Sequence, residues 1–308
     1  MDKISIVVPC YNEEEVLNIF YEEVTKTLKK MKVDYELILV NDGSKDKTLD
    51  IMKELAKDKS IKYISFSRNF GKEAAMLAGF KATTGDYIGI MDVDLQDPPY
   101  LLEEMYSTLK TTDFDCVGSR RVTRKGEPII RSWFAKKYYK IINSISKVEH
   151  VSGARDFRLM TRQMLDAFLE LKEKNRYTKG LFSFVGFKTK WLEYENVERV
   201  AGITKWNFWR LFLYAMEGIT SFSVVPLMIS IIFGLIFLLV SLILLIVSLF
   251  TYFYTLNIIL IILFLIAGIQ LICLGVVSVY FSKPYIESRN RPIYIIKSTN
   301  VKNMELVE

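Results

Sequence analysis

The sequence predicts an α/β fold with a mainly parallel sheet, followed by a part that lies in a membrane. Short β-rich runs alternate with helical patterns from residue 3 to residue 119. This alternation is typical of parallel sheets that are covered by helices on both faces. Further along, no charged residue occurs from Gly218 to Ser282. That stretch is longer than the roughly 20 apolar residues that one membrane crossing needs.

The first part divides into strand and helix units of ordinary length. Strands are expected at residues 3–10, 35–44, 61–67, 86–94 and 114–119, and helices at 13–31, 46–58, 72–83 and 99–110. The polar clusters PCYNEE, NDGS, SRNFGK and DVDLQD fall at the ends of the first four strands. Ligands of such sheets bind beyond the carboxyl ends of the strands. A binding site is therefore expected at that edge.

Residues 129–147 carry an amphipathic helical pattern. Apolar side chains from Ile130 to Ile145 recur at helical spacing, whereas the basic residues, Arg131 among them, lie mostly off that stripe. A basic amphipathic helix of this kind suits a membrane interface, and packing on the sheet is the alternative. Residues 204–218 form a second candidate interface helix, which leads into the uncharged stretch.

The uncharged stretch fits two transmembrane helices, near Val224–Phe250 and Leu256–Phe281, joined by the aromatic segment TYFYTLN. Lys and Arg flank the pair on both sides, and the linker has no positive charge. By the positive-inside rule, both termini and the N-terminal domain lie in the cytoplasm. The expected domains are residues 1–215, cytoplasmic and including the interface helices, 216–282, a hairpin in the plasma membrane, and 283–308, a cytoplasmic tail.

Charge and cysteine content argue against other classes of protein. The net charge of +6 suits an anionic membrane surface, and no motif for binding nucleic acid is present. Cys10, Cys116 and Cys273 lie far apart and have no metal-binding spacing. Because a cytoplasmic domain disfavours disulfides, these cysteines are expected to be ordinary buried residues.

Three carboxylates follow the fourth expected strand, in the segment MDVDLQDPP. Asp92 and Asp94 alternate, so their side chains lie on one side of an extended chain. Such a cluster is costly unless a cation is present. Magnesium commonly uses one or two carboxylates together with phosphate oxygens. We therefore expect Asp92 and Asp94 to bind a divalent ion with a phosphorylated substrate, and Asp97 to cap the helix that begins around Pro98.

Four segments, VVPCYNEE, VNDGSKDKT, SRNFGKEAAMLAGFKATTGDYIGIMDVDLQDPP and GARDFRLMTR, together resemble the family 2 glycosyltransferases, which have a Rossmann-like GT-A fold. Within that family the resemblance is to polyprenyl-phosphate glycosyltransferases, and it runs over essentially the whole chain. The Gln-x-x-Arg-Trp motif of processive synthases is absent from the sequence. The resemblance implies inverting transfer of a sugar from a nucleotide diphosphate to polyprenyl (undecaprenyl) phosphate. UDP-glucose and UDP-N-acetylglucosamine are the favoured donors.

The resemblance also implies roles for individual residues. Asp92 and Asp94 would bind Mg²⁺ or Mn²⁺, with Asp94 as the direct and catalytic ligand. Asp156 matches the carboxylate that is catalytic in relatives, either as proton acceptor or as orienter of acceptor or sugar; a salt bridge with Arg155 or Arg158 is the structural alternative. The implied donor-binding residues are Pro9, Tyr11, Asn12, Glu13, Asp42, Arg68, Gly71, Lys72, Asp92, Val93 and Gln96. The implied ligands of the acceptor phosphate are Arg121, Arg131, Arg199 and Lys205.

Several alternatives remain open at this stage. Asn12 and Asp42 could merely shape turns, and the run from Thr204 to Trp206 departs from the Ser-Lys-Tyr that the family often has. A transferase acting on another lipid or on a glycan would carry the same motifs. A lipid-carrier translocator should bury polar groups in its membrane segments, and a scaffold would not need the carboxylates. The resemblance also implies a homo-oligomer, which is a tetramer in the resembling enzymes.

Overall fold

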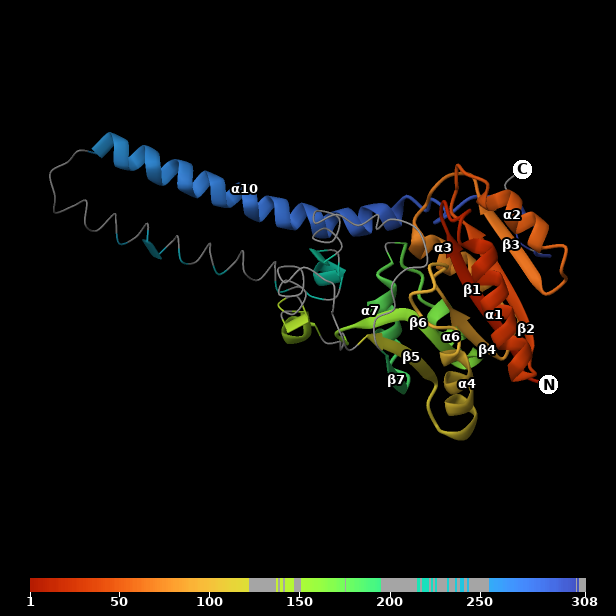
Figure 1. Ribbon diagram of the computed structural model, residues 1–308. Coiled ribbons are helices and arrows are strands. Elements are labelled where there is room, and N and C mark those ends of the chain that lie inside the picture. The colour runs from red at the N-terminus through yellow and green to blue at the C-terminus, as the bar shows by residue number, and fades with distance from the viewer. Residues whose placement is uncertain are drawn as a thin grey trace.

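The computed structural model describes residues 1–121, 151–174, 176–194 and 255–302 without a break, together with residue 304 and scattered residues between 137 and 146 and between 215 and 243. An eight-stranded sheet organises these residues, in the order β7-β5-β6-β4-β1-β2-β3-β8 (Figure 1). The strands are β1 (Lys3–Cys10), β2 (Asp34–Asn41), β3 (Ile61–Phe66), β4 (Tyr87–Ile90), β5 (Cys116–Arg121), β6 (Ala154–Thr161), β7 (Thr189–Tyr194) and β8 (Ile296–Thr299).

The sheet is mainly parallel, as the sequence predicts. Strand β1 pairs in parallel with β2 and β4, β2 pairs in parallel with β3, and β5 pairs in parallel with β7. Strand β6 runs antiparallel to both β4 and β5. The carboxyl ends of β1 to β4 therefore meet at one edge of the sheet.

Helices cover both faces of the sheet. They are α1 (Leu17–Met31), α2 (Thr48–Leu55), α3 (Lys72–Lys81), α4 (Leu101–Thr111), α6 (Arg162–Leu169), α7 (Thr178–Phe184) and α10 (Thr255–Ser288). One apolar cluster joins the sheet to α1, α2 and α4, and Phe20 and Met105 are among its fully buried members. A second cluster joins the other face to α3, α6 and α7 through residues such as Phe80 and Phe168. Burial of apolar residues on both faces explains why the strands read as nearly continuous apolar runs.

The segment expected as a C-terminal tail contributes a strand to the sheet. Strand β8 pairs antiparallel with β3, with Ile64 opposite Thr299 and Ser65 opposite Ser298. It covers the edge that β3 would otherwise expose, and an exposed edge strand invites pairing with other chains. A run of only four residues, IKST, gives no strand signal that sequence reasoning could use.

One helix among the described residues is long and apolar enough to cross a membrane, at Leu265–Ser288 within α10. None of its apolar window is buried in the molecule, and Figure 1 shows α10 projecting away from the sheet. The other expected span, near Val224–Phe250, lies mostly outside the described residues. Where the expected helix at 129–147 is described, Ile142 is buried and Lys137 and Lys140 are exposed.

Candidate active site at the carboxyl ends of the strands

The loops that follow β1 and β2 are joined by hydrogen bonds. The backbone N–H of Asn12 donates to Ser44 Oγ (2.9 Å), and Asn12 Oδ1 accepts from the backbone N–H of Lys45 (2.9 Å). The backbone N–H of Glu13 donates to Thr48 Oγ1 (2.8 Å). Asn12 has a φ of 54°, a conformation that asparagine tolerates better than most residues. The Asn12 side chain thus shapes this turn, as one alternative held, and the donor contact of this loop stays a prediction.

Asp42 fastens the loop that follows β3. Its carboxylate is 4% exposed and accepts hydrogen bonds from the backbone N–H groups of Phe70 (2.7 Å) and Gly71 (3.0 Å). Burial raises the pKa of Asp42, and these two N–H groups oppose that rise. Gly43 lies so close to this loop that an added Cβ would come within 2.3 Å of the carbonyl carbon of Arg68. Burial and backbone contacts thus bring the loops after β2 and β3 together at the site.

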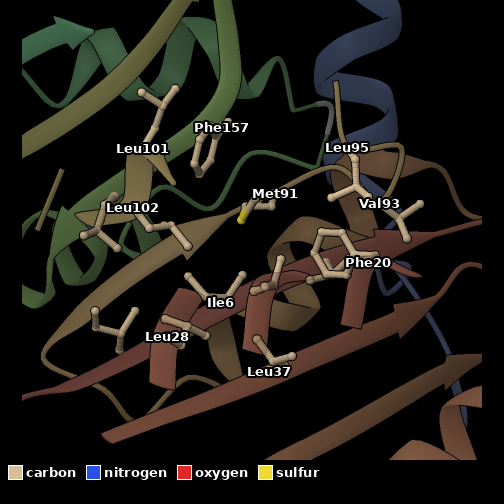
Figure 2. Close-up of a cluster of buried hydrophobic side chains, with 14 of the residues drawn as sticks. Ile6, Phe20, Leu28, Leu37, Met91, Val93, Leu95, Leu101, Leu102 and Phe157 are labelled. Carbon is tan, nitrogen blue, oxygen red and sulfur yellow. The ribbon is translucent and has the colours of Figure 1, made fainter. Parts of the chain in front are cut away.

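Burial alternates along the segment that follows β4. Met91, Val93 and Leu95 pack into the core beside Phe20 and Leu101 (Figure 2). The residues between them, at positions 92, 94 and 96, are half-buried. The Asp92 and Asp94 side chains therefore both stay partly accessible, although the extended chain expected through Asp94 already ends at Ile90. The Val93 side chain, at 3% exposure, packs into the core, so a donor could touch this residue only through its backbone.

Lys72 connects the carboxylates of two different strands. It is the first residue of α3, and its Nζ lies 2.6 Å from Asp92 Oδ1 and 2.6 Å from Asp156 Oδ2. Burial acts to lower the pKa of Lys72, but the charges of Asp156 and Asp92 outweigh it and raise the pKa above its usual value. Lys72, implied to line the nucleotide, thus lies where β4 and β6 meet.

Asp156 is held by two ammonium groups. Besides Lys72, Lys179 of α7 places its Nζ 4.0 Å from Asp156 Oδ1. Burial acts to raise the pKa of Asp156, yet Lys72 and Lys179 hold it far below the usual range. The described structure shows no ion pair from Asp156 to Arg155 or Arg158: Arg155 pairs with Asp97, and Arg158 donates to the backbone oxygens of residues 155 and 156. The charge of Arg158 still helps to lower the pKa of Asp156.

Asp97 does not cap a helix, which corrects the sequence prediction. Helix α4 begins at Leu101, and its N-cap residue makes no side-chain capping bond. Asp97 is 1% exposed and instead accepts hydrogen bonds from Arg155 Nε (3.3 Å) and from the Tyr194 hydroxyl. Burial raises the pKa of Asp97 against the opposing charge of Arg155. Arg155 also donates to Gln96 Oε1 (3.3 Å). Arg155 and Tyr194 therefore connect the segment after Asp94 to β6 and β7.

Two further residues of this site carry no sequence signal. Lys179 is one, and Glu73, beside Lys72, is the other. Burial raises the pKa of Glu73 to about 8, and the charge of Asp156 adds to the rise. The hydroxyl of Thr178 donates to the Glu73 carboxyl group. Contacts between α3 and α7 create this arrangement, and they span more than 100 residues of sequence.

A cavity of about 230 Å³ opens on the α7 side of β6. Its walls include the rings of Tyr177, Phe182 and Trp191, and both Arg158 and Lys179 reach it. The Arg158 guanidinium lies 4.0 Å from the centroid of Phe182. The cavity therefore combines aromatic walls with positive charge, next to the lysine that contacts Asp156.

Some of the remaining predicted site residues lie in the described part of the chain, and others lie outside it. Pro9 is the last residue but one of β1, opposite Val40, and Tyr11 follows that strand, half-buried. The Arg68 guanidinium stacks on Phe70 at 4.0 Å. Arg121 ends β5, half-buried, and its backbone N–H donates to Gly153. The expected phosphate ligands Arg131, Arg199 and Lys205 lie outside the described residues.

The carboxylates fit a divalent ion that is shared with a substrate. Within the described ranges, no three acidic, histidine or cysteine side chains gather closely enough to hold a metal by themselves. One or two carboxylates suffice for magnesium when phosphate oxygens complete its shell. Asp92 and Asp94, both half-buried, would supply such a partial set. Cys10, Cys116 and Cys273 are free thiols.

Comparison with known proteins gives a family match over most of the domain. Residues 5–169 match the family described as Glycosyl transferase family 2. A relative from Bacillus subtilis, named "Putative glycosyltransferase CsbB", is 43% identical over 99% of this chain and 94% of its own length. The bactoprenol glucosyl transferase of Shigella phage SfV is 39% identical over 97% of this chain and 100% of the relative.

A more distant likeness is found among solved structures. The glucosyl-3-phosphoglycerate synthase of Mycobacterium tuberculosis, in complex with Mn²⁺, UDP-glucose and phosphoglyceric acid, is 20% identical. The match covers 71% of this chain and 78% of that chain, with a TM-score of 0.44.

Proposed function

Because the chain belongs to glycosyl transferase family 2, we propose that it transfers a sugar from a nucleotide diphosphate to undecaprenyl phosphate, with inversion at the anomeric carbon. Glucose and N-acetylglucosamine, carried by UDP, are the preferred donor sugars. One observation carries the proposal: Lys72 contacts both Asp92 of the Asp-x-Asp segment and Asp156 of β6. A donor diphosphate at the first carboxylate would bring its sugar to the second.

The donor half of the site comprises the loops after β1 to β4. Asp42, with its N–H partners at Phe70 and Gly71, supports a nucleotide pocket between β2 and β3. Arg68, exposed on that loop, would bring positive charge to the nucleotide. Asp92 and Asp94 would hold Mg²⁺ or Mn²⁺ at the diphosphate. The ion would supply a Lewis acid that stabilises negative charge on the departing diphosphate.

The acceptor needs little help from a base. The second ionisation of a phosphate monoester falls near pH 6, so the lipid phosphate oxygen is already largely anionic at neutral pH. That oxygen would form a bond to the anomeric carbon while the bond to the diphosphate breaks and the diphosphate keeps the electron pair. Asp156 is a weak base because Lys72 and Lys179 depress its pKa. This favours Asp156 as the group that orients sugar and acceptor, and it argues against a neutral hydroxyl acceptor, which would need a base.

The cavity beside β6 supports an acceptor that is both anionic and apolar. Arg158 and Lys179 would attract the phosphate, and the rings of Phe182 and Trp191 would contact the first part of the prenyl chain. A free sugar hydroxyl would gain little from two cations. The cavity is thus better matched to a prenyl phosphate than to a glycan.

The position of β8 supports a membrane hairpin. Strands β1 and β8 belong to one sheet, so the chain before and after α10 must lie on the same side of any membrane. If α10 crosses the bilayer once, an earlier segment must cross it in the other direction, and residues 224–250 are the uncharged candidate. With positive flanks on both sides, we place the domain and both termini in the cytoplasm, at the plasma membrane.

Transfer into a defined bilayer tests the proposal. Full-length protein reconstituted with undecaprenyl phosphate is offered radiolabelled UDP-glucose, UDP-N-acetylglucosamine, UDP-galactose or GDP-mannose, each with Mg²⁺, Mn²⁺ or EDTA. We expect labelled lipid from one UDP-sugar, with the product lost in EDTA. Matched bilayers containing undecaprenol without phosphate serve as the control and should give no product.

Two outcomes would contradict the proposal. Equal transfer to undecaprenol would mean that the phosphate is not the nucleophile. Transfer to a soluble glycan but not to the lipid would assign the alternative acceptor class.

A further inference from the structure

The C-terminal segment contacts the start of the loop from Ser67 to Lys72, which belongs to the proposed donor site. Tyr294, shortly before β8, stacks on Phe66 at the end of β3, with ring centroids 5.0 Å apart and an interplanar angle of 12°. The backbone N–H of Ser67 donates to the carbonyl of Ile295 (3.0 Å). The loop that begins at Ser67 therefore leaves the sheet directly from the contact with Tyr294.

A continuous series of contacts leads from Tyr294 to the site. Phe66 meets Phe70 edge to face, with centroids 5.7 Å apart at 88°. The Arg68 guanidinium lies over the Phe70 ring, 4.0 Å from its centroid. The backbone N–H of Phe70 then donates to Asp42. Aromatic pairs of this kind add stability beyond the area they bury.

The segment is also fixed at both of its ends. At the end of α10, Glu287 accepts a hydrogen bond from the backbone N–H of Lys174 (2.6 Å). After β8, Asn300 accepts from the backbone N–H of Tyr63 (2.8 Å). Tyr294 lies between these attachments and is half-buried. Its position on Phe66 is therefore set by the rest of the domain.

We propose that Tyr294 is a positioning residue for the donor nucleotide, acting through Phe66 and Phe70 on the loop from Arg68 to Lys72. The C-terminal strand then does more than cover a sheet edge, because it links the end of the membrane helix to the donor half of the site. The inference rests on the proposed function only for the identity of the donor. The effect on the loop itself needs no ligand.

The test compares three variants of the full-length protein in detergent micelles. Tyr294→Ala removes the ring, Tyr294→Phe keeps it, and Lys297→Ala changes an exposed side chain on β8. Hydrogen–deuterium exchange follows the amides of residues 67–72, and calorimetry measures binding of UDP and of GDP with Mn²⁺. Thermal unfolding and the KM for undecaprenyl phosphate report whether a variant is loosened as a whole.

In Tyr294→Ala we expect exchange of residues 67–72 to accelerate about three- to tenfold, and the dissociation constant of the nucleotide that wild type binds to rise by a similar factor. Exchange in β1 and the KM for undecaprenyl phosphate should stay within twofold of wild type. Tyr294→Phe and Lys297→Ala should behave as wild type does.

Unchanged exchange at residues 67–72 in folded Tyr294→Ala would overturn the inference, and so would equal acceleration throughout the sheet. If Tyr294→Ala does not fold, Tyr294→Leu takes its place, with the same expected results. Failure of wild type to bind either nucleotide would count against the proposed donor alone, since the exchange result still decides the role of Tyr294.

Discussion

Acidic side chains pair with lysines at both ends of the parallel strands, the edge where the strands start and the edge where they finish. The two edges differ in how many hydrogen-bond donors and cations each acid has. At the edge where the strands start, Glu36 is 2% exposed. It accepts hydrogen bonds from Ser5 Oγ (2.6 Å) and from the backbone N–H of Thr84 (2.6 Å), and it pairs with Lys3 (2.9 Å) and Lys62 (2.7 Å). Burial opposes ionisation, but these donors together lower the pKa of Glu36 to about 2.

At the opposite edge, one ammonium group is shared between two acids, and Lys179 lies farther from the second of them, 4.0 Å from Asp156. Lys72 lies 2.6 Å from both Asp92 and Asp156, and the three side chains are 18% to 39% exposed. Asp94 follows two residues after Asp92 and is half-buried too. This edge keeps its acids partly open to solvent, where a cation or a substrate can reach them.

A buried acid therefore does not by itself mark a functional site. Glu36 is surrounded by protein donors, so we expect it to contribute to the stability of the fold. Asp92 and Asp156 are more exposed than Glu36, and they are expected to matter for binding. Substitutions at the two edges should therefore separate activity from stability.

The largest effect is expected at Asp94. Asp94→Asn keeps the shape of the side chain but removes an anionic ligand for the divalent ion. Transfer of sugar to undecaprenyl phosphate should fall by about 10²- to 10³-fold or more, since charge on the leaving diphosphate loses its stabilisation. The midpoint of thermal unfolding should change little. Transfer at the wild-type rate in ordinary magnesium would show that Asp94 does not serve the metal.

Asp156 should come next. Asp156→Asn retains the size of the group but loses the charge that holds Lys72 and Lys179, so sugar and acceptor would be misaligned. We expect transfer to fall by about 100-fold. The pH profile discriminates between roles: an orienting group predicts the same pH dependence in wild type and variant above pH 6. Loss of an acidic limb from the profile, where activity falls as a base is protonated, would instead assign proton transfer to Asp156.

Glu36 should show the opposite pattern. Its folded-state pKa of about 2 lies below the ordinary 4.5, so its stabilisation is present above pH 4.5 and is lost as pH falls through about 2. Glu36→Gln should therefore reduce the free energy of unfolding at pH 7 by about 3 kcal/mol. Chemical denaturation measures this change, and transfer per folded molecule should equal that of wild type. A specific loss of transfer would erase the distinction between the two edges.

The smallest effect concerns Glu73. Its folded-state pKa of about 8 lies above the ordinary 4.5, so its contribution is full below pH 4.5 and is lost as pH rises through about 8. Wild type should lose about 1 kcal/mol of stability from pH 7 to pH 9 relative to Glu73→Gln, in which this titration is absent. Unfolding measured at both pH values gives the difference. Parallel curves for the two proteins would mean that Glu73 is ionised normally.

The strand ends and the carboxylates that follow them could be predicted because local signals define them. Strand β1 has the predicted bounds, and the polar clusters mark strand ends that a parallel sheet must bring to one edge. The alternation of Asp92 and Asp94 with buried apolar neighbours is visible in the sequence, although the strand itself ends at Ile90. These features depend on residues that are close in sequence.

The rest depends on contacts between distant segments. Strand β6 was not predicted, because Arg155, Asp156 and Arg158 interrupt its apolar run and their partners lie on other elements. Asp97 resembles a helix cap in sequence, yet Arg155 and a tyrosine of β7 claim its carboxylate. The pairing of β8 with β3 joins residues more than 200 positions apart, and no local pattern announces it.

The central claim is that Asp94 belongs to donor binding whereas Asp156 acts after the donor is bound. Calorimetric titration of UDP with Mn²⁺ into wild type, Asp94→Asn and Asp156→Asn tests it most directly. We predict that Asp94→Asn weakens UDP binding by about tenfold or more, and that Asp156→Asn binds UDP within twofold of wild type. Equal weakening in both variants would contradict the claim and assign Asp156 to the nucleotide.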